Sequence, residues 1–342
     1  MSRILVTGGT GYIGSHTVVE LMASGYDVTI VDNLSNSNIE VLNGIEAITG
    51  KRPDFENVDC LDFMNLNAVF DRFKDIVGVI HFAASKAVGE SVLKPLLYYN
   101  NNIGSLVNLL TIMQQHGVNN LVFSSSCTVY GQPDEEHLPV DETAPRKTAT
   151  SPYGNTKQIN EDIICDQVHA VPELNATILR YFNPIGAHPT ALIGELPNGV
   201  PNNLLPFVTQ TAAGIREKLR VFGDDYNTPD GSCIRDYIYV VDLAKAHVKA
   251  LERMLNVQDR DRVEVFNLGT GRGLSVLEII RHFESATGVK LNYEIVGRRE
   301  GDIEQVWAKA DKANNVLGWK ADTPIDDVLR SAWKWQQRLE KE

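Results

Sequence analysis

Three side chains, those of Ser126, Tyr153 and Lys157, have the types and the spacing that proton abstraction from a hydroxyl group requires. Tyr153 and Lys157 are four residues apart on a predicted helix, so both side chains lie on one face of it. Ser126 follows Ser124 and Ser125 at the C-terminal end of a predicted strand, where parallel sheets place their active sites. The pattern predicts a catalytic trio of a phenol, a cation and a hydroxyl.

The chemistry of this trio depends on the pKa of the Tyr153 phenol. A free phenol has a pKa near 10, which is too high for a base at neutral pH. A cation about 4 Å away contributes roughly 4 kcal/mol at an effective dielectric of about 20, which corresponds to about 3 pKa units. We therefore expect the Lys157 ammonium to bring the pKa of Tyr153 close to neutrality, and the Ser126 hydroxyl to share the substrate proton.

A glycine-rich turn near the start of the chain has the pattern of a dinucleotide site. Gly8, Gly11 and Gly14 follow a predicted strand and open a predicted helix. Glycines let the backbone turn tightly and approach a pyrophosphate, which lies on the helix N-terminus. Asp32 ends the next strand, where a carboxylate accepts both hydroxyls of a ribose and repels a 2′-phosphate. The sequence therefore predicts NAD rather than NADP as cofactor.

The elements that must position these residues alternate between strands and helices. Continuous apolar runs predict buried strands, and a 3.6-residue apolar period predicts the helices between them. This alternation indicates a Rossmann-type α/β fold, a doubly wound parallel sheet covered by helices on both faces. Predicted strands cover residues 3–7, 27–32, 77–84, 120–126 and 176–183, and predicted helices cover about 15–24, 95–116 and 152–170.

The pattern changes at Pro184, where prolines and glycines accumulate up to Pro206 and indicate a linker or a set of binding loops. The later elements are shorter and mixed, with strands over 235–241 and 263–268 and a C-terminal helix over about 325–339. We expect an NAD-binding domain and a smaller mixed α/β domain that mainly binds substrate, with the ligand between them. These domains would cover 1–183 and 184–342, with residues of about 236–268 packing back on the first domain.

Composition excludes several kinds of partner. The formal net charge is −12 and no basic block stands out, so nucleic acid and anionic membranes are poor partners. No apolar run is long enough to span a bilayer, and the start of the chain lacks a signal segment. The four cysteines are widely spread without metal-binding spacing, and the eight histidines suggest no metal site. We expect a reduced, cytoplasmic protein without a metal ion.

Longer runs of sequence resemble the UDP-glucose 4-epimerases, which are extended short-chain dehydrogenase/reductase enzymes. The glycine and YxxxK motifs specify only the superfamily, whereas three other runs are far more specific. The resemblance extends from about residue 3 to about residue 335, and its specific runs are HFAASKAVGES, RYFNPIGAHP and PNNLLPF.

The resemblance assigns roles by matched position. It repeats Ser126, Tyr153 and Lys157 as the catalytic trio, which also contacts the cofactor. Other positions resemble cofactor contacts: Gly8, Gly11, Tyr12, Ile13, Gly14, Asp32, Asn33, Asn36, Ser37, Asp59, Cys60, Phe82, Ala83, Ala84, Lys86, Asn101 and Phe182. A third set resembles the nucleotide-sugar site: Asn183, Asn203, Leu204, Phe222, Arg235, Arg299, Asp302 and Val306.

The resemblance implies an isomerase that interconverts UDP-galactose and UDP-glucose by transient oxidation at carbon 4, with tightly bound NAD. It also implies a homodimer, which is usual in the family. One alternative is a nucleotide-sugar 4,6-dehydratase, whose relatives place acidic residues beside the catalytic hydroxyl; this chain has Cys127 and Thr128 there. A second alternative is a dinucleotide-sensing protein without turnover, which typically lacks the Tyr and the Lys.

The chain departs from the family pattern at a few positions. Cys127 stands where relatives often have alanine, and Ala84-Ser85 stands where they often have Gly-Leu. We interpret Cys127 as a small packing residue rather than a nucleophile. Val306 matches a position where narrow enzymes carry tyrosine. Its smaller side chain favours acceptance of N-acetylated UDP-sugars, unless neighbouring side chains close the space.

Overall fold

A parallel sheet of seven strands is the largest feature of the computed structural model, which describes residues 2–299 and 302–341. Its strand order is β10-β6-β5-β4-β1-β2-β3, and each neighbouring pair is parallel. The seven strands are mostly apolar because both faces of the sheet are covered, except for β3 at one edge, which is polar and partly exposed. They are β1 (Arg3–Thr7), β2 (Asp27–Asp32), β3 (Asp54–Asn57), β4 (Ile76–His81), β5 (Asn120–Ser126), β6 (Asn175–Tyr181) and β10 (Val263–Leu268).

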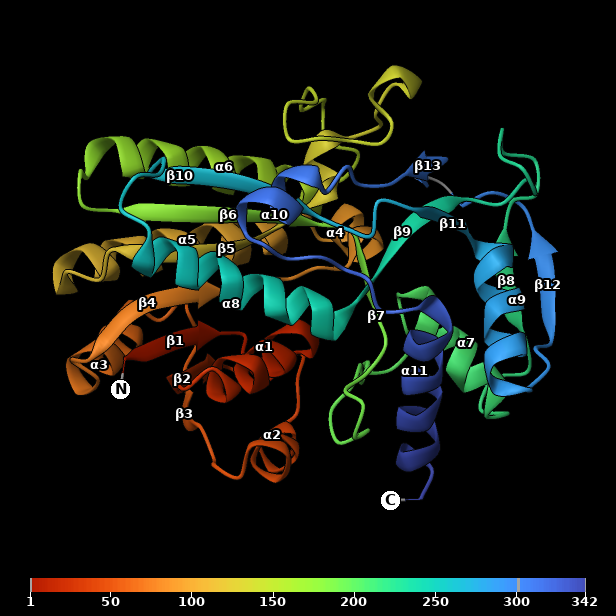
Figure 1. The fold of residues 1–342 in the computed structure, drawn as a ribbon, viewed down its shortest axis with the longest axis horizontal. Coiled ribbons are helices and arrows are strands. Elements are labelled where there is room, and N and C mark those ends of the chain that lie inside the picture. Colours follow the sequence, from red (N-terminus) through yellow and green to blue (C-terminus); the bar gives the residue numbers. More distant parts are fainter. Residues whose placement is uncertain (1, 300–301, 342) are drawn as a thin grey trace.

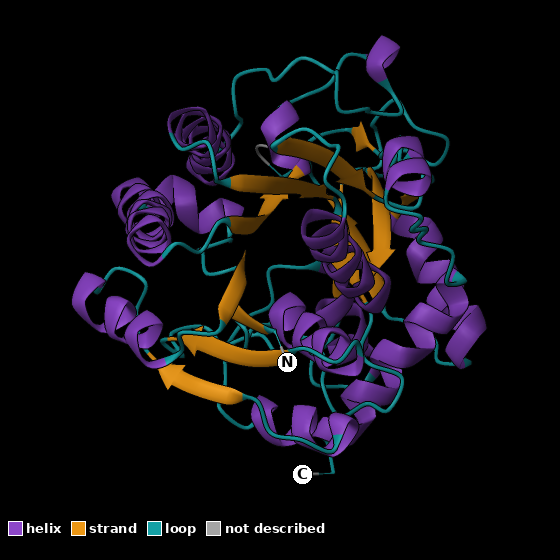
Figure 2. Cartoon of the chain, turned by 60° about the vertical axis from the view of Figure 1, so that its left-hand side comes forward, coloured by secondary structure: helices purple, strands orange, loops and turns teal. Residues whose placement is uncertain are grey.

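Helices cover both faces of this sheet (Figures 1 and 2). On one face, α1, α2 and α8 bury residues such as Val18 and Leu251 against Ile80 of β4. On the other face, α3, α5 and α6 bury residues such as Phe70 and Ile164. This arrangement confirms the expected doubly wound α/β fold. The helices of this part are α1 (Tyr12–Ala23), α2 (Val41–Thr49), α3 (Phe63–Arg72), α4 (Val88–Leu93), α5 (Pro95–His116), α6 (Pro152–Ala170) and α8 (Val240–Asn256).

The order of the strands reverses at the pair β1 and β4, because the chain runs outward from β1 to β3 on one side and from β4 to β6 on the other. Ligands of open α/β sheets bind beyond the carboxyl ends of the strands at such a point. Thr7 and His81 end these two strands in register, and Thr7 Oγ1 lies 2.7 Å from His81 Nδ1. His81 is buried and stacks on Phe123, as expected of a core residue.

A smaller mixed part lies beside the main sheet, on the right of Figure 1. β9 is central there, with β7 parallel, β13 parallel and β11 antiparallel to it, while β8 and β12 form a separate parallel pair. The strands are β7 (Asn183–Ile185), β8 (Leu219–Phe222), β9 (Ile234–Tyr239), β11 (Gly273–Ser275), β12 (Tyr293–Val296) and β13 (Gln305–Val306). The helices are α7 (Leu204–Ala212), α9 (Val276–Thr287), α10 (Asp311–Val316) and α11 (Ile325–Leu339), and two short 3₁₀ helices are η1 (Cys127–Tyr130) and η2 (Glu135–His137).

The chain crosses between the two parts more than once. β10 pairs with β6 along its whole length, and α8 packs against α1 on the face of the main sheet. Further along, Ala313 of α10 belongs to the same buried cluster, and the Trp319 indole donates to the carbonyl of Asp242 at 2.7 Å. Segments from the second half of the sequence therefore complete the main sheet.

Several expected boundaries were wrong for identifiable reasons. The single strand expected over 176–183 is two strands, because the chain leaves the main sheet after Tyr181 and pairs with β9 from Asn183. The strand expected over 77–84 ends at His81, and the helix expected from 15 begins at Tyr12, directly after the glycine turn. The strand expected over 235–241 ends at Tyr239, where α8 begins.

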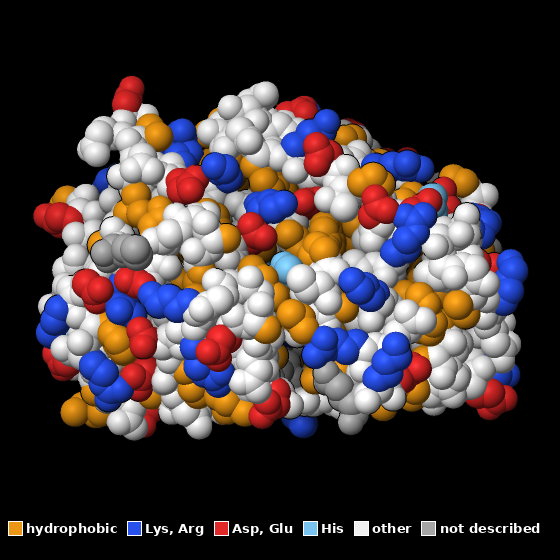
Figure 3. All heavy atoms as spheres, turned by 60° about the horizontal axis from the view of Figure 1, so that its bottom comes forward, with side chains coloured by type: hydrophobic (Ala, Val, Ile, Leu, Met, Phe, Trp, Pro, Cys, Tyr) orange, Lys and Arg blue, Asp and Glu red, His pale blue; other side chains and the backbone are white. Residues whose placement is uncertain are grey.

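Charged side chains of both signs are mixed on the surface. On the face drawn in Figure 3, acidic and basic side chains are interspersed rather than gathered into one basic field. Each helix within the described ranges is too short or too polar to cross a membrane.

Candidate active site

The glycine turn between β1 and α1 leaves no room for side chains on its glycines. Gly8 has a φ of +70°, and a Cβ there would approach the backbone nitrogen of Ala83 to 2.8 Å. A Cβ on Gly14 would come within 2.2 Å of the Gly8 carbonyl oxygen. Gly11 precedes α1, so the first amides of this helix are not capped by a side chain. Tight backbone approach at a helix N-terminus is what a pyrophosphate group requires.

Acidic and polar side chains gather at the carboxyl ends of β2 and β3. The Asp32 carboxylate is buried and accepts hydrogen bonds from the backbone of Thr10 at 3.2 Å and from the Ser37 hydroxyl at 3.1 Å. Asn33 donates to Asp59 at 2.9 Å. Four expected cofactor contacts, Asp32, Asn33, Ser37 and Asp59, thus lie together in a form that suits ribose hydroxyls and an adenine edge. Of two other expected cofactor contacts, Asn36 is exposed, whereas Cys60 is buried in the core.

The segment after β4 carries the next group of expected cofactor contacts. Phe82 packs at 4.7 Å from the His247 ring, while Ala83 and Ala84 are partly buried beside the glycine turn. Lys86 is exposed. Asn101 of α5 donates to the Ser85 hydroxyl at 3.1 Å, which places it beside this segment.

Tyr12, Ile13 and Phe182 lie where the two parts of the molecule meet. The Tyr12 hydroxyl donates to the carbonyl of Gly186 at 2.6 Å, and Ile13 packs in the clusters on both sides. Phe182 is buried between β6 and β7, in a cluster that also contains Val306. The three residues therefore lie where the chain passes between the main sheet and the smaller part, and not on the outer surface.

The structure brings the three expected catalytic residues together. Ser126 ends β5, and Tyr153 is the second residue of α6, which begins after the Ser151 cap. The Ser126 side chain lies close enough to the Tyr153 phenol to lower its pKa. One helical turn later, the Lys157 ammonium lies 6.0 Å from the centre of the Tyr153 ring and donates to the carbonyl of Ser124 at 2.6 Å.

The expected lowering of the Tyr153 pKa was wrong for the protein chain by itself. Burial raises the pKa of Tyr153 well above its usual value, and the hydrogen bond from Ser126 offsets only part of this effect. Burial also lowers the pKa of Lys157 to about 8, against the opposing charge of Glu161. Both shifts have one physical cause, which is that a water-poor site disfavours each charged form.

Cys127 follows Ser126, and burial disfavours the thiolate form of its side chain. Burial raises the pKa of its thiol to about 12, although the charge of Arg235 opposes this. A thiol with such a pKa stays protonated at neutral pH and is a poor nucleophile. The structure thus agrees with the interpretation of Cys127 as a packing residue.

The residues expected to hold the nucleotide sugar fall into two groups. Asn183 lies in β7, Leu204 begins α7, and the Asn203 amide donates to the Glu195 carboxylate at 2.5 Å. In the second group, the Arg299 guanidinium lies 5.4 Å from the Phe222 ring and pairs with Asp302 at 2.6 Å. Arg299 thus pairs with a residue three positions later in the chain, while about half of its side chain remains exposed.

Arg235 and Val306 both lie near Cys127, which follows the expected catalytic residue Ser126. They are opposite each other in the pair of β9 and β13, and Arg235 donates to the carbonyl of Ile234 at 2.8 Å. A cavity of about 300 Å³ opens nearby, and its lining includes Asp302, Gln305 and Leu138.

Asp236 is a buried residue that sequence reasoning missed. Its carboxylate accepts bonds from the backbone amides of Thr270, Gly271 and Ala308, and from the Thr270 hydroxyl, at 2.7–3.2 Å. It thereby fixes the segment that follows Val306. The available signal was a carboxylate inside the apolar run of β9, since a charge in a buried strand needs partners.

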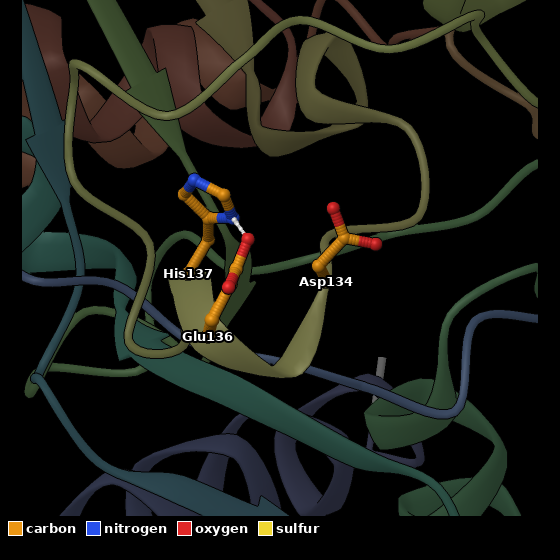
Figure 4. Close-up of side chains that lie close together, drawn as sticks. All are labelled: Asp134, Glu136 and His137. Carbon is orange, nitrogen blue, oxygen red and sulfur yellow. Dashed lines mark ion pairs between the residues drawn. The ribbon is translucent and has the colours of Figure 1, made fainter.

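A group of three side chains on η2 has the residue types of a metal site. Asp134, Glu136 and His137 lie close together, with His137 and Glu136 3.8 Å apart (Figure 4). Asp134 pairs instead with Lys147 at 2.5 Å, and both acidic residues are exposed. Exposed carboxylates of this kind are common on protein surfaces, and we assign no ion to them.

Comparisons with known proteins agree with this geometry. The family model described as GDP-mannose 4,6 dehydratase matches residues 5–332. UDP-glucose 4-epimerase of Dictyostelium discoideum is 52% identical, over 98% of this chain and 95% of the relative. UDP-glucose 4-epimerase of Bacillus subtilis is 51% identical, over 97% and 96%.

A solved structure extends the likeness to the fold. UDP-glucose 4-epimerase from Stenotrophomonas maltophila, with bound NAD and formylated UDP-arabinopyranose, superposes with a TM-score of 0.95. It is 48% identical, over 100% of this chain and 99% of that chain. The chain described here belongs to the UDP-glucose 4-epimerases, within the wider family whose model carries the dehydratase description.

Proposed function

We propose that this chain interconverts UDP-galactose and UDP-glucose by transient oxidation at carbon 4 of the sugar. The observation that carries the proposal is that Ser126, Tyr153 and Lys157 come together beyond β5. The Lys157 ammonium lies 6.0 Å from the centre of the Tyr153 ring and donates to the carbonyl of Ser124 at 2.6 Å. We assign Tyr153 as the proton acceptor and Ser126 as the hydroxyl that positions the substrate. The family membership supports the same reaction.

We propose NAD as the bound cofactor. The glycine turn has no space for a Cβ at Gly8 or Gly14, and the buried Asp32 carboxylate suits a ribose without a 2′-phosphate. When bound, NAD supplies the acceptor for the hydride of carbon 4 and the donor that returns it. The Stenotrophomonas relative was crystallised with NAD, which supports this choice.

In the proposed mechanism, Tyr153 accepts the proton of the sugar 4-hydroxyl while Ser126 holds that hydroxyl in place. Because burial opposes the phenolate, the nearby Lys157 charge must stabilise it. The 4-keto sugar then turns over while its nucleotide stays anchored, and Tyr153 returns the proton. Arg235 and Arg299 are the residues that we assign to the diphosphate, because guanidinium groups donate to such oxygens in a forked geometry.

The geometry disfavours the dehydratase alternative. Elimination of water needs an acid and a base beside the catalytic hydroxyl, but Cys127 and Thr128 follow Ser126. The carboxylate of Asp236 acts on Cys127 through its charge, yet it already accepts four hydrogen bonds from neighbouring segments. The sensing alternative is disfavoured because both Tyr153 and Lys157 are present and adjacent.

One experiment separates these functions. The purified protein is incubated with UDP-galactose without added NAD, and the products are separated by chromatography. We expect UDP-glucose to form up to an equilibrium mixture. A 4-keto-6-deoxy sugar would identify a dehydratase, and unchanged UDP-galactose with bound NAD would identify a sensing protein.

We also propose that the chain acts as a homodimer. Val92 and Leu93 of α4 and Leu96 and Leu97 of α5 are exposed apolar side chains close together in sequence, with Leu93 at 82% and Leu96 at 80%. A single soluble chain rarely exposes such a cluster. Light scattering tests this: Leu96→Lys is expected to give a monomer, whereas Ile215→Lys, an exposed position beyond α7, leaves the mass unchanged.

The remaining assignments are part of the same proposal. Residues 1–183 form the cofactor-binding part and residues 184–342 mainly the substrate part, while about 236–268 return to the first. A cytoplasmic location suits the four cysteines, which are free of disulfides. Fractionation of the producing cells with a cytosolic marker tests the location.

A further inference from the structure

Asn102 of α5 joins two segments that carry expected active-site residues. Its side chain is 1% exposed. Its Oδ1 accepts from the backbone amide of Ser85 at 2.8 Å, and its Nδ2 donates to the Ser85 carbonyl at 3.0 Å. One amide group therefore pairs with both backbone polar groups of a single residue in the segment after β4.

The same Nδ2 reaches the catalytic helix. It donates to the Thr156 hydroxyl at 3.0 Å, and that hydroxyl donates in turn to the carbonyl of Tyr153 at 2.7 Å. Thr156 is fully buried between the two catalytic positions of α6. Asn102 thus contacts the segment of Lys86 on one side and the first turn of α6 on the other.

A second residue of α5 holds the same segment one helical turn earlier. The Tyr98 hydroxyl accepts from the backbone amide of Ala87 at 3.0 Å and donates to Glu90 at 3.0 Å. Lys86 is therefore flanked by two residues whose backbones are bound to α5. Because Tyr98 and Asn102 are four residues apart, they hold this segment from one face of the helix.

We propose that Asn102 is a positioning residue that fixes the Lys86 segment and the catalytic helix relative to each other. It sets the place of the cofactor beside the Tyr153 hydroxyl without touching either reactant. Buried polar groups left without partners are unfavourable, so removal of this amide would let both segments shift. Displacements of about 1 Å at a reacting centre can reduce rates by about 100-fold.

The test rests on the proposed function and compares three variants of the full chain. Asn102→Ala removes the bonds to both segments. Thr156→Val removes only the link to α6 and leaves the pairing with Ser85 intact. Asn120→Ala is the matched control, because its amide donates to the carbonyl of Val77 at 2.8 Å, at the opposite ends of β4 and β5.

Three quantities are measured: the rate of NAD release in the presence of an NAD trap, the kcat and KM for UDP-galactose, and the midpoint of urea unfolding. For Asn102→Ala we expect NAD release about 10-fold faster and a kcat about 10-fold lower, with KM within about 3-fold. Thr156→Val is expected to lower kcat while NAD release stays at the wild-type rate. Asn120→Ala loses stability but keeps both rates.

The proposal is overturned if Asn102→Ala matches Asn120→Ala in both rates, or if Thr156→Val leaves kcat unchanged. Should Asn102→Ala fail to fold, Thr156→Val still decides the link to the catalytic helix. A wild-type protein that binds NAD without converting UDP-galactose would refute the proposed function alone. In that case the NAD release rates of the two variants still decide whether Asn102 positions the segment.

Discussion

Val306 of β13 lies opposite Arg235 of β9 in the parallel pair that joins these strands. Val306 is 3% exposed and shares a buried cluster with Phe182, an expected cofactor contact. A small apolar side chain therefore lies beside the expected diphosphate arginine and in one cluster with an expected cofactor contact. The size of this side chain is the feature that we connect with the choice of sugar.

We expect the wild-type chain to epimerise UDP-N-acetylglucosamine as well as UDP-glucose, and Val306→Tyr to remove the N-acetyl activity selectively. The added ring would occupy the space that an acetamido group needs. Enlarging a packed side chain costs about 1–3 kcal/mol of folding stability. The midpoint of unfolding is therefore measured together with the rates for both substrates. A wild-type protein that converts UDP-galactose normally and leaves the N-acetyl sugar untouched would refute this idea.

Tyr153→Phe is expected to lose turnover by about 10²–10⁴-fold, which is the contribution of a general base. We expect the variant to keep its fold, because phenylalanine retains the ring and loses only the hydroxyl. It should also retain NAD. Steady-state rates and the absorbance of the bound cofactor measure both points, and more than half of the wild-type turnover in the variant would exclude the mechanism.

The pH dependence follows from Lys157. Its pKa is lowered to about 8, so the ammonium is present below this pH and is lost as the pH rises through it. Because the Tyr153 phenolate needs this charge, we expect kcat/KM for UDP-galactose to fall on the alkaline side with a midpoint near that value. Lys74→Met, which changes an exposed lysine, serves as the control. A kcat/KM that continues to rise above the Lys157 pKa would contradict this role.

NAD is expected to co-purify with the protein, partly in reduced form, because an epimerase must retain the cofactor through both hydride transfers. The protein is denatured and its supernatant assayed enzymatically for NAD and NADH. A supernatant without nicotinamide, combined with strict dependence on added NAD, would instead indicate an ordinary dehydrogenase.

Glu161→Gln is expected to destabilise the fold by about 3–5 kcal/mol, because it leaves a buried arginine without its counter-charge. Glu161 is 2% exposed and accepts two bonds from Arg180, at 2.9 and 2.6 Å. Urea unfolding measures the loss. Asp71→Asn, which breaks the exposed pair with Lys74, should change the midpoint far less. Equal losses of stability in the two variants would show that the buried pair stabilises the fold no more than the exposed pair does.

Local pattern was sufficient for most strands of the main sheet and for several long helices, but the edge strand β3 and the helix α8 were not predicted. α5, α6 and α11 match the expected ranges, because a long helical period defines a helix within one segment; in addition, Ser151 caps α6 and Gly117 ends α5. The short strands β11 and β13 were not predicted. Each has only two or three residues and exists because it pairs with β9, which is distant in sequence.

In the candidate site, too, local sequence predicted some features, whereas others depend on residues distant in sequence. Ser126, Tyr153 and Lys157 could be placed because a strand end and a helix face position them. The sign of the Tyr153 pKa shift could not, since it depends on burial by several segments at once. Asn102 was missed for a related reason, because its partners Ser85 and Thr156 are 17 and 54 residues away.

The place of β10 at the edge of the main sheet has a consequence during synthesis. β6 is complete at Tyr181, but its outer partner is translated only with Val263–Leu268. Until then, β6 presents a row of unpaired backbone amides and carbonyls, which is a surface on which other chains can add strands. A nascent chain that has left the ribosome up to this point therefore depends on later residues, or on a chaperone, to stay free of aggregation.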